Sequence, residues 1–261
     1  MIKAKKSLGQ NFLVDKNIID KITNLIEIKD KYVLEVGPGT GSLTHSLLKK
    51  EPKKLYVVEK DDNLALILNK NFSDKIKIFN NDILSFNEKS ICEQPLIVYG
   101  NLPYNISTEI LCKWILNLKK EKLWFSNLIL MFQKEVADRI ISQYNCSSYG
   151  RLSILANWKL DIKKIMDIKP NSFFPIPKID STLLFFSPKF KFLKLKDPYN
   201  LEKITRIFFN HRRKMIKKPY YSIFKNDEVS KKLKLDLNLR PQNLDFEVYY
   251  NLAKEYEDLR S

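Results

Sequence analysis

Three of the six glycines in this chain fall within five residues, at Gly37, Gly39 and Gly41. They follow the apolar segment 32–36 (Tyr-Val-Leu-Glu-Val) and precede a helix-like segment that begins near Ser42. This order predicts a buried strand, a tight turn and a helix. Gly37 and Gly39 let the backbone approach a ligand closely, and the helix N-terminus attracts negative charge. Dinucleotide-binding turns carry glycine at the sixth position of their GxGxxG run. That position is Ser42 here, which disfavours a nicotinamide cofactor.

Acidic residues near this turn favour another adenosine-containing cofactor. The segment 35–41 has the form Glu-x-Gly-x-Gly-x-Gly, which is typical of S-adenosylmethionine-dependent methyltransferases. Glu59 ends the next apolar strand, where an acid can accept hydrogen bonds from both ribose hydroxyls. Asp82 follows a third strand, 75–79, and is expected to hold the cofactor's adenine amino group. A surface turn acid is an equally good interpretation of Asp82 alone, but Glu59 and the glycines favour the ligand.

The run 100–104 (Gly-Asn-Leu-Pro-Tyr) places an amide, a rigid proline and an aromatic ring after a fourth apolar strand. The Asn101 oxygen can accept a hydrogen from an exocyclic amine. Pro103 fixes its own backbone and biases Leu102 towards an extended conformation. Tyr104 offers a face on which a base can stack. The run therefore predicts an adenine site, with an ordinary strand-to-helix turn as the alternative.

The chain is basic, with 46 Lys and Arg against 30 Asp and Glu and a net charge of +16. Such a balance favours a polyanionic partner, either nucleic acid or an acidic membrane surface. Lysine, asparagine and isoleucine are frequent throughout, so charge alone does not establish RNA binding. Two histidines and three cysteines without a CxxC pair predict no metal site, no serine triad and reduced thiols in a cytoplasmic protein. The N-terminus lacks a signal-peptide pattern, and no apolar run is long enough for a membrane span.

Apolar runs alternate with helix-like segments over the first two thirds of the chain. They predict an α/β domain with strands near 32–36, 55–59, 75–79, 95–99, 125–132, 162–168 and 181–186. The composition changes near Pro188, so we expect a first domain over 1–188 and a second, helical domain over 189–261.

Basic side chains flank an apolar stripe in a helix predicted over 200–218. One side of this helix can pack while the other meets RNA phosphates. A merely solvated face is the alternative. The candidate RNA-binding residues are Arg206, Arg212, Arg213, Lys214 and Lys217.

Motifs along nearly the whole chain resemble those of the ribosomal RNA adenine N6,N6-dimethyltransferase family, in its small-subunit branch. The matching segments are 8–13 (Leu-Gly-Gln-Asn-Phe-Leu), 35–41, 58–59, 81–82, 100–108, 132–136 (Phe-Gln-Lys-Glu-Val), 149–153 (Tyr-Gly-Arg-Leu-Ser), 174–181 (Phe-Pro-Ile-Pro-Lys-Ile-Asp-Ser) and 209–214 (Phe-Asn-His-Arg-Arg-Lys). His211 stands where that branch is expected to have Gln, outside the candidate site.

The resemblance implies a Rossmann-like seven-stranded methyltransferase domain followed by a small all-helical C-terminal domain. It places the S-adenosylmethionine contacts at Asn11, Leu13, Gly37, Glu59, Asp82 and Asn101. It places the target adenosine at Asn101, Leu102, Pro103 and Tyr104, with Phe173 as a second stacking ring. The implied substrate is a pair of adjacent adenosines in the 3′-terminal hairpin of 16S rRNA, within the assembling 30S subunit. We expect a monomer that acts in the cytoplasm.

Two other functions fit parts of this pattern. One is a non-enzymatic RNA-binding or transcription factor that kept the fold, although the intact 100–104 run and glycine turn argue against lost activity. The other is a DNA adenine methyltransferase, which would flip its base into a comparable pocket. The C-terminal motifs resemble those of the RNA enzymes instead.

Overall fold

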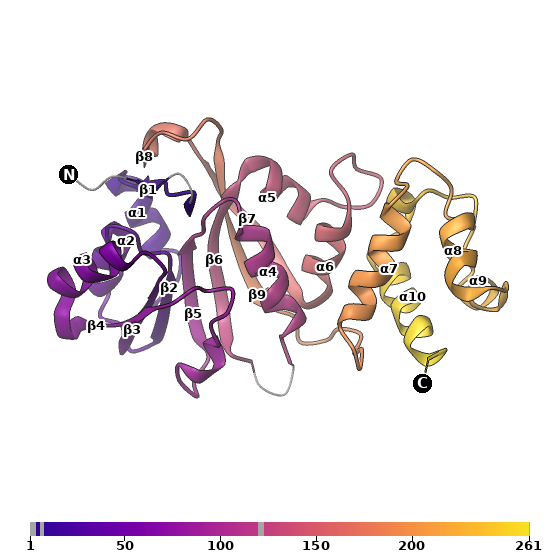
Figure 1. The fold of residues 1–261 in the computed structure, drawn as a ribbon, viewed down its shortest axis with the longest axis horizontal. Helices are drawn as coiled ribbons and strands as arrows, with labels where there is room; N and C mark the ends of the chain where they lie inside the picture. The colour runs from indigo at the N-terminus through magenta and orange to yellow at the C-terminus, as the bar shows by residue number, and fades with distance from the viewer. Residues whose placement is uncertain (1–3, 6–7, 120–122, 261) are drawn as a thin grey trace. The chain divides into compact units, whose positions relative to one another are not determined.

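The computed structural model describes residues 4–5, 8–119 and 123–260. Within these residues the chain forms two compact units (Figure 1). The first holds the residues up to 113 together with 118–137 and 162–188, and the second holds 114–117, 138–161 and the residues from 189 onwards. The boundary proposed at residue 188 coincides with a change of unit, but the second unit also takes in two earlier segments. No helix among the described residues has the length and apolar character needed to cross a bilayer.

A mostly parallel sheet organises the first unit. In the described part of the chain it has seven strands, in the order β4-β3-β2-β5-β6-β9-β7. Neighbours from β4 to β6 run parallel, and β9 runs antiparallel to β6. The strands are β2 (Tyr32–Val36), β3 (Lys54–Glu59), β4 (Ile76–Asn80), β5 (Leu96–Asn101), β6 (Phe125–Gln133), β7 (Leu160–Ile168) and β9 (Ser181–Pro188). This arrangement confirms the α/β fold class.

The strand order reverses between β2 and β5, because β3 and β4 extend the sheet on one side and β5 and β6 on the other. Ligands in open α/β sheets bind outside the carboxyl ends of the strands at such a reversal. Both strands are almost completely buried, as expected for parallel strands covered on both faces. The reversal therefore places the carboxyl ends of β2 and β5 side by side at one crevice.

Five helices of the described chain follow or precede these strands. They are α1 (Lys16–Thr23), α2 (Ser42–Leu48), α3 (Asp62–Phe72), α4 (Ser107–Leu116) and α5 (Lys134–Ile141). The Asp15 carboxylate caps α1 by accepting the backbone N–H groups of Asn17 (3.0 Å) and Ile18 (3.3 Å). Short 3-10 turns are η2 (Ser73–Lys75), η3 (Glu88–Ser90), η4 (Pro170–Ser172) and η5 (Pro241–Asn243).

A two-stranded pairing was not expected from the sequence. Strand β1 (Phe12–Leu13) runs antiparallel to β8 (Phe173–Phe174), with Phe12 opposite Phe174 and Leu13 opposite Phe173 (Figure 1). Leu13 and Phe173 belong to the core cluster of the first unit, together with residues such as Val33, Leu47 and Tyr99. The pairing therefore attaches the N-terminal segment to the body of this unit.

The second unit is helical. In its described residues lie α6 (Arg151–Lys159), α7 (Tyr199–Phe209), α8 (Lys217–Phe224), α9 (Glu228–Lys232) and α10 (Phe246–Asp258). The single helix predicted over 200–218 is wrong, because α7 ends at Phe209 and a turn precedes α8. Ile216 is fully buried whereas Met215, which belongs to the predicted stripe, is 56% exposed. Met215 lies at helical spacing from the buried Ile204 and Phe208, but its neighbour Ile216 is buried in its place. The chain therefore does not continue as one helix through these residues.

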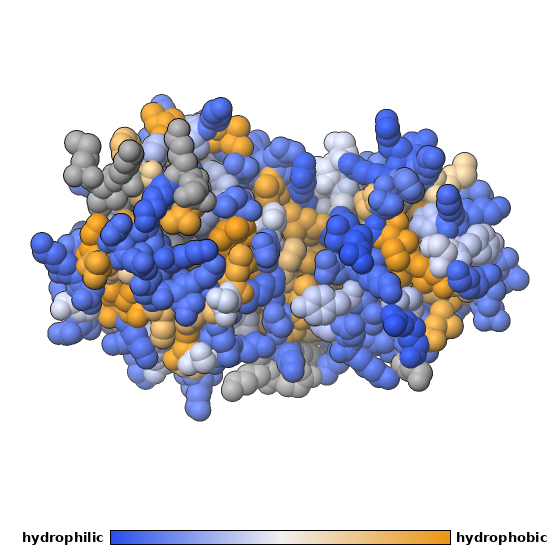
Figure 2. All heavy atoms as spheres, in the orientation of Figure 1, coloured by the Kyte–Doolittle hydropathy of each residue, from blue (hydrophilic) through white to orange (hydrophobic). Residues whose placement is uncertain are grey.

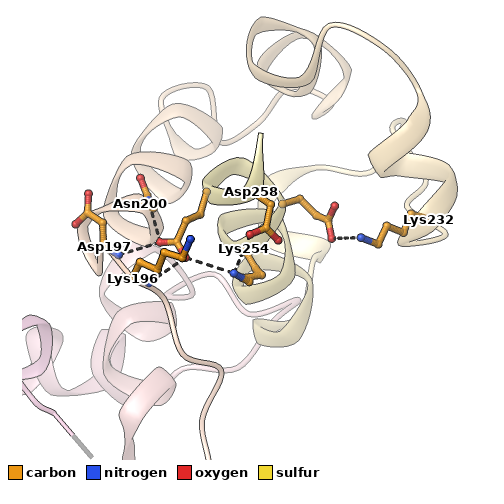
Figure 3. Close-up of polar contacts among 8 residues, drawn as sticks. Lys196, Asp197, Asn200, Lys232, Lys254 and Asp258 are labelled. Atoms are coloured by element: carbon orange, nitrogen blue, oxygen red, sulfur yellow. Dashed lines mark hydrogen bonds and ion pairs between the residues drawn. The ribbon is translucent and has the colours of Figure 1, made fainter. Parts of the chain in front are cut away.

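Carboxylates of α10 hold the segment that leads into α7 (Figure 3). The Glu257 carboxylate accepts the backbone N–H groups of Lys196 (2.9 Å) and Asp197 (2.8 Å) and the side-chain amide of Asn200 (3.1 Å). The Lys254 ammonium lies 2.8 Å from the Asp258 carboxylate. These contacts are internal to the helical unit, and we assign them a structural role.

Hydrophilic side chains cover most of the face that Figure 2 shows, with smaller apolar groups between them. This matches the lysine-rich composition.

Candidate active site

A pocket opens at the carboxyl ends of β2, β3 and β5. Its walls come from the N-terminal segment, the glycine turn, the end of β3, the loop after β4 and the loop after β5. Among its lining residues are Gly9, Asn11, Leu13, Glu35, Gly37, Gly39, Glu59, Lys60, Asp82, Ile83, Asn101, Leu102, Pro103 and Tyr104. The six residues that the resemblance places at the cofactor, together with Gly39 of the glycine turn, line this one pocket, as do four of the five expected at the target adenosine.

At Gly37 and Gly39 the glycine turn lines the pocket with backbone that carries no side chain. Gly39 has a φ of +57°, a left-handed conformation that disfavours a side chain. A Cβ on Gly39 would lie 2.7 Å from the Phe12 ring, too close for any real contact. Glycine is therefore required by both backbone and packing, and the turn leads directly into the N-terminus of α2.

Glu59 ends β3 as a buried carboxylate, 7% exposed. Its two oxygens accept backbone N–H groups from Gly39 (3.2 Å) and Asp61 (2.9 Å). Burial raises the pKa of Glu59, and these hydrogen bonds oppose the rise. Each carboxylate oxygen has more than one acceptor position. Glu59 is thus oriented by the backbone and keeps capacity for hydroxyl donors in the pocket.

Glu35 is a site residue that the sequence did not single out, although it opens the Glu-x-Gly-x-Gly-x-Gly segment. It lines the pocket but is only 1% exposed, and its carboxylate accepts the Thr44 hydroxyl at 2.7 Å. Burial raises the pKa of Glu35 to about 8, and the nearby Glu59 charge adds to the rise while Thr44 opposes it. Glu35 is therefore largely protonated at neutral pH in this structure.

The Asn101 amide is held in one orientation. Its Nδ2 donates to the backbone carbonyl of Asn11 at 2.7 Å, which leaves Oδ1 as the acceptor on the other arm of the amide. Leu102 is buried and anchors the loop. Tyr104 is half-buried at the pocket wall, and burial raises the pKa of its hydroxyl. These residues present an amide oxygen and an aromatic ring to the same space.

The N-terminal segment is fastened to the pocket by Asp61. Its carboxylate lies 2.9 Å from the Lys5 ammonium and accepts the Gln10 side-chain amide at 3.0 Å. Asp61 also donates its backbone N–H to Glu59. The segment that carries Asn11 and Leu13 is thus tied to the carboxylate that ends β3.

Asp82 lies in the loop after β4, where one carboxylate oxygen is 2.6 Å from the Lys60 ammonium and the other accepts the Leu84 N–H at 3.0 Å. The hydrogen bond from Lys60 is the largest cause that lowers the pKa of Asp82. Lys60 is a second lining residue that the sequence did not indicate, because lysines are frequent along the whole chain. Asp82 is at the pocket as expected, but it is already paired.

Phe173 does not line the pocket. It is 1% exposed and packs in the core, whereas the next residue, Phe174, is 57% exposed. Successive strand residues point to opposite faces. In β8 the inward position falls on Phe173, so this ring presents no face to an adenine in this structure.

The basic residues expected at RNA lie on α7, on the turn after it and at the start of α8. Arg206, Arg213, Lys214 and Lys217 are exposed. Arg212 is half-buried and donates to the backbone carbonyls of Cys146 and Ser147. Arg212 therefore also supports a neighbouring loop of the same unit. In the described chain, His, Cys, Asp and Glu form no group of three suited to a metal ion.

Comparison with known proteins identifies the family of this chain. A family model described as "Ribosomal RNA adenine dimethylase" matches residues 1–258. Ribosomal RNA small subunit methyltransferase A of Pelagibacter ubique is 64% identical over 260 residues, covering 99% of each chain. The protein of that name from a Wolbachia strain of Drosophila simulans is 42% identical over 269 residues, covering 99% of this chain and 96% of the relative. The crystal structure of a dimethyladenosine transferase from Plasmodium falciparum superposes with a TM-score of 0.78 at 26% identity, covering 95% of this chain and 98% of that one. The chain belongs to the ribosomal RNA adenine dimethylase family.

Proposed function

We propose that this protein transfers methyl groups from S-adenosylmethionine to N6 of two adjacent adenosines in the 3′-terminal hairpin of 16S rRNA. The product is N6,N6-dimethyladenosine, and the substrate is the assembling 30S subunit in the cytoplasm. The observation that carries the proposal is a single pocket that joins the glycine turn and Glu59 to Asn101 and Tyr104. Membership of the family supports the reaction type and the rRNA substrate.

The residues present fit an adenosyl cofactor. Glu59 supplies a fixed carboxylate for ribose hydroxyls, and Gly37 and Gly39 line the same pocket. Asp82 and Ile83 line the same pocket. We assign Asp82 to the adenine amine, which its carboxylate would accept in addition to the Lys60 ammonium and the Leu84 N–H, and Ile83 to the apolar face of the ring. When bound, S-adenosylmethionine supplies an electrophilic methyl group on a sulfonium centre.

The chain's own part in the reaction is positioning. An adenine amine is a weak nucleophile, because its lone pair is delocalised into the ring. The Asn101 oxygen, oriented through the Asn11 carbonyl, accepts a hydrogen from that amine and favours a more pyramidal nitrogen. The Tyr104 ring stacks on the base. Alignment of this kind can supply about 7–11 kcal/mol of the barrier. As the methyl group is transferred, the sulfonium sulfur would leave as a neutral thioether, and the cationic nitrogen would release one proton to solvent. The monomethylated nitrogen then keeps one hydrogen, so the same acceptor can serve a second transfer.

RNA binding is assigned to the exposed cations of the helical unit, Arg206, Arg213, Lys214 and Lys217. Clustered lysines and arginines that neutralise phosphates release counterions and so give salt-dependent affinity. Arg212 contributes less directly, because it already bonds two carbonyls. We propose that the protein acts as a monomer.

The test is methyl transfer to defined particles. The protein is incubated with methyl-labelled S-adenosylmethionine and 30S particles that lack the mark, and the rRNA is then digested to nucleosides. We expect label in N6,N6-dimethyladenosine and none with fully methylated particles. A parallel reaction with duplex DNA should give no label, and label there instead of in the rRNA would indicate a DNA adenine methyltransferase. Particle binding without transfer would indicate a non-enzymatic factor.

A further inference from the structure

The hydroxyl of Tyr104 is hydrogen-bonded to the hydroxyl of Ser181 at 2.5 Å. Ser181 is the first residue of β9 and is completely buried. Burial raises the pKa of Tyr104, so its hydroxyl stays protonated at neutral pH and one of the two oxygens always has a hydrogen to give. We propose that Ser181 is a positioning residue, which fixes the Tyr104 ring in the orientation that receives the target adenine. This inference rests on the proposed function of the pocket.

Ser181 is suited to this task because its backbone is fixed from two sides. It pairs with Gln133 in the antiparallel ladder between β9 and β6. The preceding carbonyl, on Asp180, accepts the backbone N–H of Lys134 at 2.9 Å. A hydroxyl on such a rigid support gives the ring a fixed anchor.

Tyr104 itself needs that anchor. It lies in the loop between β5 and α4, where Leu102 is buried but Tyr104 is only half-buried. A tyrosine side chain in a loop can rotate about two bonds, and each rotation moves the ring face relative to Asn101. The bond to Ser181 restrains both rotations of a side chain that lines the pocket. Phe173, the other ring expected to stack, is in the core, so of the two expected rings Tyr104 is the one at the pocket.

The neighbouring residue provides a matched control. Thr182 is also completely buried in β9, and its hydroxyl donates to the Asp167 carboxylate at 2.6 Å. Neither residue lines the pocket, but Ser181 is hydrogen-bonded to Tyr104, which does, whereas Asp167 does not. Ser181→Ala and Thr182→Val each delete one buried hydroxyl from adjacent positions of one strand. Only Ser181→Ala should lower the rate of methyl transfer.

The experiment is a double-mutant cycle of Ser181→Ala and Tyr104→Phe, with Thr182→Val as the control and all assays well below the thermal transition. Single-turnover methylation of unmarked 30S particles should fall about 2- to 10-fold in each single variant, as expected for one lost hydrogen bond. The double variant should fall no further, because both substitutions remove the same bond. Thr182→Val should keep the wild-type rate.

A second measurement separates positioning from general damage and needs no cofactor. Particles carrying 2-aminopurine in place of a target adenosine should show brighter emission with Ser181→Ala than with wild type, because a mobile ring stacks less with the base. A wild-type rate in Ser181→Ala, multiplicative losses in the double variant, or an equal loss in Thr182→Val would overturn the role of Ser181. Absence of methylation by the wild type would overturn the proposed function instead.

Discussion

Glu35 should make the folded state less stable as the pH rises. Its pKa is about 8 in the folded protein against an ordinary value of 4.5. Below pH 4.5 the carboxyl is protonated in both states, and burial carries no penalty. Between 4.5 and about 8 the unfolded chain releases the proton while the folded chain holds it, so each unit of pH favours the unfolded state. Above about 8 both states are ionised and the loss stops growing.

The size of this loss follows from the same interval. One pH unit corresponds to about 1.4 kcal/mol, which sets an upper limit of about 5 kcal/mol at pH 8 and above. Relaxation and water penetration reduce such penalties in real proteins. Glu35→Gln keeps the shape and can still accept the Thr44 hydroxyl, but it never ionises. We therefore expect Glu35→Gln to be more stable than wild type by about 2–4 kcal/mol at pH 8 and by little at pH 4.5.

The assay is urea unfolding of both proteins from pH 4.5 to 9, followed by tryptophan fluorescence. The difference between the two curves cancels the titration of every other group, provided that the variant leaves those groups unchanged. Thr44→Val is a matched control, because it removes the hydrogen bond that lowers the pKa of Glu35. The pKa of Glu35 should therefore rise further in Thr44→Val, and the loss of stability should continue to a higher pH than in the wild-type protein. A Glu35→Gln advantage that is the same at pH 5 and pH 8 would refute the assignment of a buried, protonated Glu35.

The remaining predictions concern the cofactor, the transfer step and RNA. Glu59→Ala should weaken S-adenosylmethionine binding by about 1.5–3 kcal/mol through loss of charge-assisted hydrogen bonds, and calorimetric titration with unchanged affinity would contradict its place in the site. Asn101→Ala should slow single-turnover methylation by on the order of 10²–10³ while particle binding persists, and a rate near wild type for both adenosines would contradict its role. Neutralising Arg213 and Lys214 should reduce the salt dependence of particle binding by up to about 0.7–0.9 log units for each lost contact, whereas Arg212→Gln should mainly lower stability. An unaltered salt slope in the double variant would favour a solvated face.

Much of the fold was predictable because its signals are local. The apolar runs near 32–36, 55–59 and 125–132 are strands, and the structure extends them by only a few residues. Glycines and prolines mark the turns between them. Parallel strands buried on both faces are continuous apolar runs, so neither their existence nor their order along the chain depends on distant contacts.

The misplaced elements depend on tertiary packing. Two-residue strands such as β1 and β8 are too short for any periodicity, and they exist because segments far apart in the chain meet. Phe173 and Phe174 are chemically identical in sequence, and only the register of that pairing decides which ring enters the core. The helix over 200–218 had a regular apolar stripe, but burial of Ile216 was more favourable than continuation of that stripe through Met215.

The same distinction divides the residues of the site. Asn101, Tyr104, Glu59 and the glycines are visible in the sequence because the chemistry needs particular residue types at strand ends. The sequence does not show which residues orient them. Ser181 ends the family-like segment 174–181, but nothing in the sequence connects it with Tyr104, 77 positions away, and the partner of the Asn101 amide is a backbone carbonyl at Asn11, which any residue would provide. Because an acceptor or a stacking ring lowers a barrier only when it is held in place, those unmarked partners should account for activity that the motifs alone cannot supply. Ser181→Ala, which keeps Asn101, Tyr104 and Glu59, is therefore expected to bind cofactor normally and to methylate slowly.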